Sequence, residues 1–185
     1  IPVGSSTGTA VYTVRADDAY TNTTDNLSVS ISSTSGGNFE AVSSTGTVAN
    51  TVVDDTDTTT VTLSSTTAGT AITEGGSITY TATVGAPVAG SALVVTLSNG
   101  QTITIPVGSS TGTAVYTVRA DDAVLNGTDN LSVSISTTSG GNFEAVSSTG
   151  TVANTVVDDT DTTTVTLSST TAGTAITEGG SITYT

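Results

Sequence analysis

The chain repeats itself at a spacing of 104 residues, since Ile1–Thr81 recurs as Ile105–Thr185 with 77 of the 81 aligned positions identical. Four positions differ, and three of them fall within one short segment that is typical of a loop. The differences are Tyr20/Val124, Thr21/Leu125, Thr23/Gly127 and Ser33/Thr137. A repeat of this length can bury a core of its own, which the shorter repeats of a solenoid cannot do. The sequence therefore predicts tandem domains.

Each copy ends in a run of carboxylates, because the sequence Val-Val-Asp-Asp-Thr-Asp closes at Asp57 and again at Asp161. A new alternating segment, Thr-Val-Thr-Leu-Ser, begins shortly after each run. We therefore expect one complete domain over residues 58–161. Residues 1–57 would be the C-terminal part of a preceding repeat, and residues 162–185 the first strands of a following one. Because both ends fall inside repeats, we expect the chain to be part of a longer parent.

Apolar side chains alternate with Ser and Thr along the complete copy, which is typical of half-buried antiparallel strands. The predicted strands are Thr60–Ser64, Ile78–Val84, Ala92–Ser98, Gln101–Pro106, Thr113–Arg119, Leu131–Ser136 and Thr149–Val156. We expect an inward face made of Ile78, Tyr80, Leu93, Val95, Leu97, Leu131, Val133 and Ile135. About seven strands with turn signals between them and no helical periodicity predict an all-β fold, an antiparallel β-sandwich.

The charge balance excludes several classes of partner. Sixteen acidic residues face only Arg15 and Arg119, with no Lys or His, so the formal net charge is -14. Nucleic acid and anionic membrane surfaces are disfavoured partners, because both are bound through Lys and Arg. No apolar run reaches the roughly 20 residues of a membrane helix. Without Cys the chain has no disulfide and no thiolate metal site, which leaves hard cations with oxygen ligands as a source of extra stability.

The order of the strands predicts where the charges lie. Strands one, three, five and seven of an up-and-down sandwich end at the same pole, and acidic or amide residues follow each of them. These residues are Glu74, Asn99, Asp121, Asp122, Asp158, Asp159 and Asp161, and Asp129 is expected near the same end. Only Glu144 is left for the opposite pole. The prediction assumes that every strand crosses the whole sandwich.

Carboxylates gathered at one pole would repel one another without a cation. Calcium takes 6 to 8 oxygen ligands in flexible geometry, whereas magnesium demands an octahedron and keeps much of its water. We therefore predict calcium as the cofactor. The candidate ligands are Glu74, Asp121, Asp122, Asp158, Asp159 and Asp161 in the complete copy, and Asp17, Asp18, Asp54, Asp55 and Asp57 in the preceding one. The alternative is that these residues are turn formers that keep the surface soluble.

The same segments carry a family resemblance. Val-Val-Asp-Asp-Thr-Asp, Thr-Thr-Val-Thr-Leu, Glu-Gly-Gly-Ser-Ile-Thr-Tyr-Thr-Ala-Thr-Val and Tyr-Thr-Val-Arg-Ala-Asp-Asp together resemble the immunoglobulin-like extender repeats of giant bacterial RTX adhesins. The acidic loops are also similar to those of Calx-beta domains. The resemblance implies an extracellular protein at the bacterial cell surface, exported by type I secretion. It also implies that calcium at the linkers stiffens a tandem array, which projects a distal ligand-binding region for adhesion or biofilm formation.

Two classes of function remain after the residue types are considered. An enzyme is not expected, because the chain lacks His, Cys and Lys, which are the usual general bases and activated nucleophiles. Arg119 is expected to make a structural ion pair at the acidic pole. Near-identical copies favour a structural spacer, whose partners are the neighbouring repeats. The alternative is a module that itself binds a surface glycan, ice or another cell. The variable loop, residues 20–23 in one copy and 124–127 in the other, is the one place where the two copies could bind a partner differently.

Overall fold

A computed structural model describes all 185 residues and shows eleven strands and no helix, which confirms the predicted all-β class. The strands are β1 Asp25–Ser30, β2 Thr47–Val52, β3 Thr58–Ser64, β4 Ala71–Thr73, β5 Ser77–Thr83, β6 Leu93–Leu97, β7 Thr102–Ile105, β8 Thr111–Thr117, β9 Asp129–Gly140, β10 Ala145–Thr149 and β11 Thr151–Val157. The structure contains no helix that could cross a membrane.

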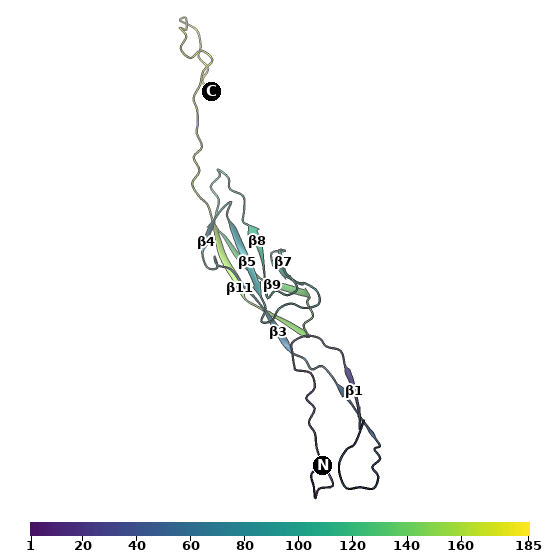
Figure 1. The fold of residues 1–185 in the computed structure, drawn as a ribbon. Coiled ribbons are helices and arrows are strands. Elements are labelled where there is room, and N and C mark those ends of the chain that lie inside the picture. The colour runs from purple at the N-terminus through teal and green to yellow at the C-terminus, as the bar shows by residue number, and fades with distance from the viewer.

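The chain is elongated, and its parts follow one another along one direction (Figure 1). Strands β1 and β2 form a two-stranded ribbon at the N-terminal end. Strands β3 to β11 form the central body, and the C-terminal segment leaves that body at the end opposite the ribbon. The chain ends therefore lie far apart, at the two ends of the molecule.

The central body consists of two sheets that share one core. One sheet has the strand order β10-β3-β5-β8 and the other β4-β11-β9-β6-β7. Neighbouring strands are antiparallel except for β10 with β3 and β11 with β4, which are parallel. Seventeen buried apolar residues from both sheets form a single cluster, including Ile78 and Tyr80 of β5 and Leu93 and Val95 of β6. Strands β3 to β11 are therefore a β-sandwich, called the sandwich below.

The sandwich has nine strands rather than the predicted seven, because β4 and most of β10 lie outside the predicted strands and each pairs at the edge of a sheet. Strand β3 lies in one sheet and β4 in the other, and β10 and β11 divide in the same way. Asn154 of β11 is buried, and its side chain donates hydrogen bonds to the carbonyls of Thr67 and Thr70 in the turn between β3 and β4. Gly150, with φ of 96°, makes the break between β10 and β11.

The predicted inward face is largely buried. Ile78, Tyr80, Leu93, Val95, Leu97 and Val133 are buried core residues. Leu131 and Ile135 are half-buried and pack against this core. The register of β9 against β6 shifts between Thr96 and Leu97, and Leu97 pairs with Ile135. A bulge of this kind interrupts the simple alternation on which the prediction for Ile135 rested.

One placement from the strand order is wrong. Asn99 does not lie at the acidic pole, because its neighbour Ser98 donates a backbone hydrogen bond to Ser134, midway along β9. The acidic pole lies further along, where Asp129 at the start of β9 pairs with Val156. Strand β6 has only five residues and does not cross the whole sandwich, so the assumption behind the placement fails there.

The two flanking segments contain parts of the same pattern without a sandwich around them. In the N-terminal ribbon, Val29 and Val48 pair across β1 and β2 and stay exposed, because no second sheet covers them. Residues 162–185, expected to hold the first strands of a following repeat, contain no strand. Ser168 and Thr185 nevertheless exchange two backbone hydrogen bonds of 2.8 and 2.9 Å. Their counterparts are Ser64 and Thr81, which pair in the sandwich.

Candidate metal centre at the domain junctions

Three carboxylates meet at the C-terminal pole of the sandwich. Glu74 follows β4, Asp121 follows β8 and Asp159 follows β11, and one carboxylate oxygen of each lies within 4.8 Å of the others. We call these residues the second acidic cluster. Backbone hydrogen bonds hold the three strand ends together, since the Glu74 N–H donates to Val157 O (2.9 Å) and the Gly75 N–H donates to Arg119 O (2.8 Å). The sheet pairing therefore fixes the distances within the cluster.

Glu74 is the buried member of this cluster, with 5% of the residue exposed. Its Oε2 accepts a hydrogen bond of 2.7 Å from Arg119 Nε, whereas its buried Oε1 has no hydrogen-bond partner. Removing an ionised carboxylate from water is costly unless each oxygen finds a donor or a cation. One oxygen of Glu74 is thus compensated by Arg119, and the other is left without a donor in a residue that clusters with Asp121 and Asp159.

Arg119 neutralises part of this pole. Its Nη1 lies 2.9 Å from Asp129 Oδ2, and its Nη2 lies 3.9 Å from Asp158 Oδ1. The hydrogen bond to Glu74, followed by the one to Asp129, raises the pKa of Arg119 against the opposing effect of burial. The structural ion pair expected for Arg119 is present. Arg119 alone balances one charge among several carboxylates, so the pole stays anionic.

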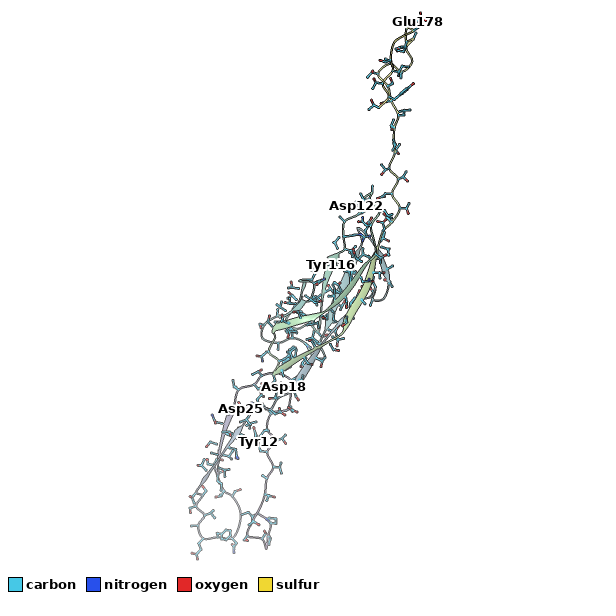
Figure 2. All side chains as sticks on the ribbon, turned by 180° about the vertical axis from the view of Figure 1, so that it is seen from behind. Tyr12, Asp18, Asp25, Tyr116, Asp122 and Glu178 are labelled. Atoms are coloured by element: carbon cyan, nitrogen blue, oxygen red, sulfur yellow. The ribbon has the colours of Figure 1, made fainter.

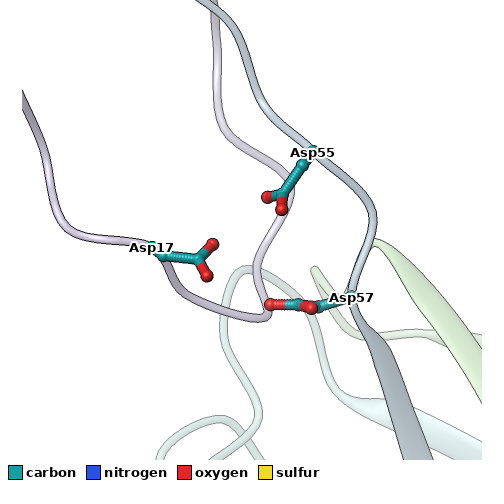
Figure 3. Close-up of side chains that lie close together, drawn as sticks. All are labelled: Asp17, Asp55 and Asp57. Carbon is teal, nitrogen blue, oxygen red and sulfur yellow. The ribbon is translucent and has the colours of Figure 1, made fainter.

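A related group lies where residues 1–57 meet the sandwich. Asp17, Asp55 and Asp57 point toward one another (Figure 3), and one oxygen of each lies within 4.8 Å of the others. We call these residues the first acidic cluster. The charge of Asp55, and then that of Asp57, raises the pKa of Asp17. Repulsion of this kind favours either a proton or a cation at the cluster.

The two clusters share two of their three repeat positions. Asp17 and Asp55 are the counterparts of Asp121 and Asp159, one repeat earlier. The third carboxylate differs, because Asp57 completes the first cluster and Glu74 the second. Residues 1–57 do not include the counterpart of Glu74, since that position falls one repeat length before it.

The other predicted ligands lie beside the clusters rather than in them. Asp18 and Asp122, at the two ends of the sandwich in Figure 2, each accept a backbone hydrogen bond of 2.8 Å from the residue two positions further on. Asp54 accepts from Arg15 (3.2 Å) and from the Asn22 N–H (2.7 Å). Asp158 faces Arg119 as described, and Asp161 lines a pocket together with Asp122, Asp158 and Asp159.

Sequence reasoning missed one acidic residue at the junction. Glu144 lies at the opposite pole of the sandwich, as expected, but that pole meets the preceding repeat. The Asp57 N–H donates to Glu144 Oε2, and the Ala145 N–H donates to Asp57 O (3.2 Å). The Asp57 N–H lowers the pKa of Glu144, but burial and the charge of Asp54 outweigh it, so this pKa is raised. The order of the repeats carries a signal for this contact, because the C-terminal pole of one repeat, which ends at Asp57, must face the opposite pole of the next, which holds Glu144.

The donor set defines what the clusters can bind. Each offers three carboxylates and no nitrogen or sulfur ligand, which is the chemistry of a hard divalent cation. Nearby backbone carbonyls and water could complete a coordination shell of 6 to 8 oxygens for calcium.

Comparison with known families gives one result. The family model described as the LapA domain matches residues 1–56 and, separately, residues 57–160. No curated protein and no solved structure matches the chain. LapA is a large adhesin-related protein, so the match supports a role in adhesion and, in general terms, a place outside the cell or on its surface. The chain carries this match over both of its repeats and belongs to the LapA domain family.

Proposed function

We propose that the chain is part of a calcium-stiffened extender in a large RTX-type bacterial adhesin. Its immunoglobulin-like domains would hold a distal ligand-binding region away from the cell for adhesion or biofilm formation, after export by type I secretion. The proposed role of the repeats is to provide length and stiffness. Its partners are then the neighbouring repeats of the same chain, and the repeats are not expected to catalyse a reaction.

The observation that carries the proposal is the unpartnered Oε1 of buried Glu74. Exposed Asp residues alone would be ordinary surface groups. A buried carboxylate oxygen without a donor, on a residue that clusters with Asp121 and Asp159, instead favours a bound cation, because Arg119 donates its Nε–H to the other oxygen. Calcium satisfies that requirement without strict geometry.

The position of the clusters supports a mechanical role for the cation. All three residues of the first cluster lie in residues 1–57, and Asp57 is the last residue before β3, the first strand of the sandwich. A cation bound there would tie the exit of one repeat to the first strand of the next. The elongated arrangement in Figure 1 is the one that such an array needs.

A calorimetric titration of the chain with calcium tests the proposal. We expect binding with a dissociation constant of about 0.1–1 mM or tighter, in the range of extracellular calcium modules. Magnesium at the same concentrations should bind more weakly. The melting temperature should rise with calcium concentration, because a ligand that binds only the folded state stabilises it by mass action.

Two variants locate the sites. Asp55→Asn with Asp159→Asn removes one charge from each cluster while preserving shape, and we expect it to weaken calcium binding at both. Glu40→Gln is the control, because it removes the same kind of charge from an exposed residue that belongs to neither cluster. Absence of calcium binding to the unmodified chain at millimolar ion would refute the calcium site. Equal loss in both variants would show a general charge effect instead.

A further inference from the structure

The variable loop has the same internal frame in both repeats. Asn22 donates to Asp18 Oδ1 (3.1 Å) and to Tyr20 O (2.8 Å), and Asn126 repeats this with Asp122 (3.2 Å) and Val124 O (2.8 Å). Arg15 and Arg119 hold the other side of the loop. The Nη1 of Arg15 donates a hydrogen bond of 2.6 Å to Thr23 O, and the Nη1 of Arg119 donates one of 2.6 Å to Gly127 O. The side chains that build the frame are identical in the two repeats, and the positions that differ contribute only backbone carbonyls to it.

In the first repeat, the variable residues of this loop contact the sandwich that follows. The Tyr20 ring stacks on Phe143, with centroids 5.4 Å apart and an interplanar angle of 20°. The Tyr20 hydroxyl donates a hydrogen bond of 2.6 Å to Pro87 O. Ala19 and Tyr20 are half-buried against the core of the sandwich. Phe143 is therefore covered by a side chain from the neighbouring repeat.

The backbone of the loop joins the same contact. The Thr21 N–H donates to Asn142 O (2.9 Å), and the Glu144 N–H donates to Ala19 O (3.3 Å), which makes an antiparallel bridge between Tyr20 and Phe143. The Asn142 side chain returns a hydrogen bond of 3.1 Å to Thr21 O. These bonds run between residues more than 100 positions apart in sequence. They need no particular side chain at position 20, so another sequence can use them.

In the second repeat, the same loop presents an uncovered apolar surface. Val124 is 67% exposed and Leu125 is 91% exposed. The acceptor surface of a following repeat would be the counterpart of Pro87 and of residues 142–144, and residues 162–185 correspond only to residues 58–81. Gly-Gly-Asn-Phe-Glu, which carries that acceptor surface, is identical in both repeats of the chain.

We propose that this loop is a docking element that seats each repeat on the next. Val124 and Leu125 would cover the counterpart of Phe143 in the following repeat, through the backbone bridge seen at Tyr20. The Val-Leu contact would lack the ring stacking and the hydroxyl hydrogen bond of Tyr20, so copies with different loops form junctions of different strength. The docking contact needs no metal and relies on the proposed function only in treating residues 1–57 as a preceding repeat.

Amide hydrogen exchange of the intact chain in chelator tests the docking. Tyr20→Ala should speed exchange at Thr21 and Glu144 by about tenfold, from loss of one aromatic pair and one hydrogen bond. Exchange at Ile78, in the core of the sandwich, is the control and should not change. Unchanged exchange at Thr21 and Glu144 in this variant would overturn the role of Tyr20 in docking.

Moving the second loop into the first junction tests the part concerning Val124 and Leu125. The variant Y20V/T21L/T23G places that loop opposite Phe143 in a chain that already contains the acceptor. We expect nuclear Overhauser contacts between the introduced methyl groups and the Phe143 ring, and exchange at Glu144 between those of the unmodified chain and Tyr20→Ala. Loss of all such contacts would overturn docking by the Val-Leu loop. The exchange and Overhauser measurements are both made without calcium, so the absence of a calcium site would not change either result.

Discussion

At the residue scale, one buried carboxylate links stability to metal binding. Glu74 lies inside the protein with one oxygen on Arg119 and the other without a partner. Arg119 also reaches Gly127 O with a bond of 2.6 Å, so the same guanidinium holds the variable loop. Removing one partner of a buried ion pair leaves the other as an uncompensated charge, which costs far more than the pair itself contributes.

Arg119→Gln should therefore destabilise the sandwich strongly in calcium-free buffer, by about 3–5 kcal/mol, since Glu74 keeps its burial and loses its cation. Chemical denaturation monitored by tyrosine fluorescence would measure the change in the free energy of unfolding. Arg15→Gln is the matched control, because its partners Asp25 and Asp54 lie in residues 1–57, and the sandwich should unfold at an unchanged midpoint. A loss below about 1 kcal/mol for Arg119→Gln would show that Arg119 is not the group that compensates the buried Glu74 carboxylate.

The sequence predicted which pole is acidic but not the role of each acidic residue. Asp121 and Asp122 follow the same strand, so strand order places them together. In the structure Asp121 joins Glu74 and Asp159, whereas Asp122 accepts the Val124 N–H. Adjacent residues separate in this way because loop backbone angles aim their side chains differently, and no periodicity encodes those angles.

At the element scale, alternation predicted the long strands and failed where a strand is short or changes sheets. Strand β5 shows regular alternation of buried and exposed residues, and the sequence placed it within one residue of its observed bounds. Strand β4 has three residues, and β10 is largely exposed, so neither carries an alternating signal. Their pairing with β11 and β3 depends on tertiary contacts.

Gly150 offers a test of the division of the last strand. Its φ is 96°, and a Cβ there would overlap Leu63 O, so Gly150→Ala should cost more than about 1 kcal/mol. The control is Gly100→Ala, since Gly100 lies in the same sandwich and has a φ of 84° with no atom near the added carbon. Thermal unfolding of the sandwich should shift further for Gly150→Ala than for Gly100→Ala. Equal shifts of the melting temperature in the two variants would show that the positive φ alone causes the loss of stability and that the Leu63 contact adds nothing.

The half-burial of Ile135 also leads to a comparison. Ile78→Ala should cost about 2–5 kcal/mol, because Ile78 is fully buried and a cavity remains. Ile135→Ala should cost clearly less, since its side chain reaches the core from a half-exposed position next to the bulge. Urea denaturation of both variants gives the two losses. A larger loss at Ile135 would mean that it, and not Ile78, occupies the centre of the core.

At the scale of the whole molecule, the junction between residues 1–57 and the sandwich combines attraction with repulsion. Tyr20 and the backbone bridge bring two repeats together, while Asp54, Asp57 and Glu144 place like charges across the same contact. Salt weakens long-range repulsion, with a Debye length of about 10 Å at 0.1 M, but it makes no directional bonds. A calcium ion at the first acidic cluster would weaken the repulsion and also make directional bonds to the carboxylates. The interdomain angle is therefore the quantity most sensitive to calcium.

We therefore expect the chain to be stiffest in calcium. Small-angle scattering should give a longer maximum dimension and a narrower distribution of shapes in calcium than in chelator, because carboxylates bridged by one ion can no longer separate. Sodium chloride at equal ionic strength should reproduce little of this change. Proteases should cut the Asp-Asp-Thr-Asp segments ending at Asp57 and Asp161 faster in chelator, because free linkers adopt more conformations. Superimposable scattering profiles with unchanged cleavage in both buffers would leave docking through Tyr20 as the source of stiffness and remove calcium from the mechanism.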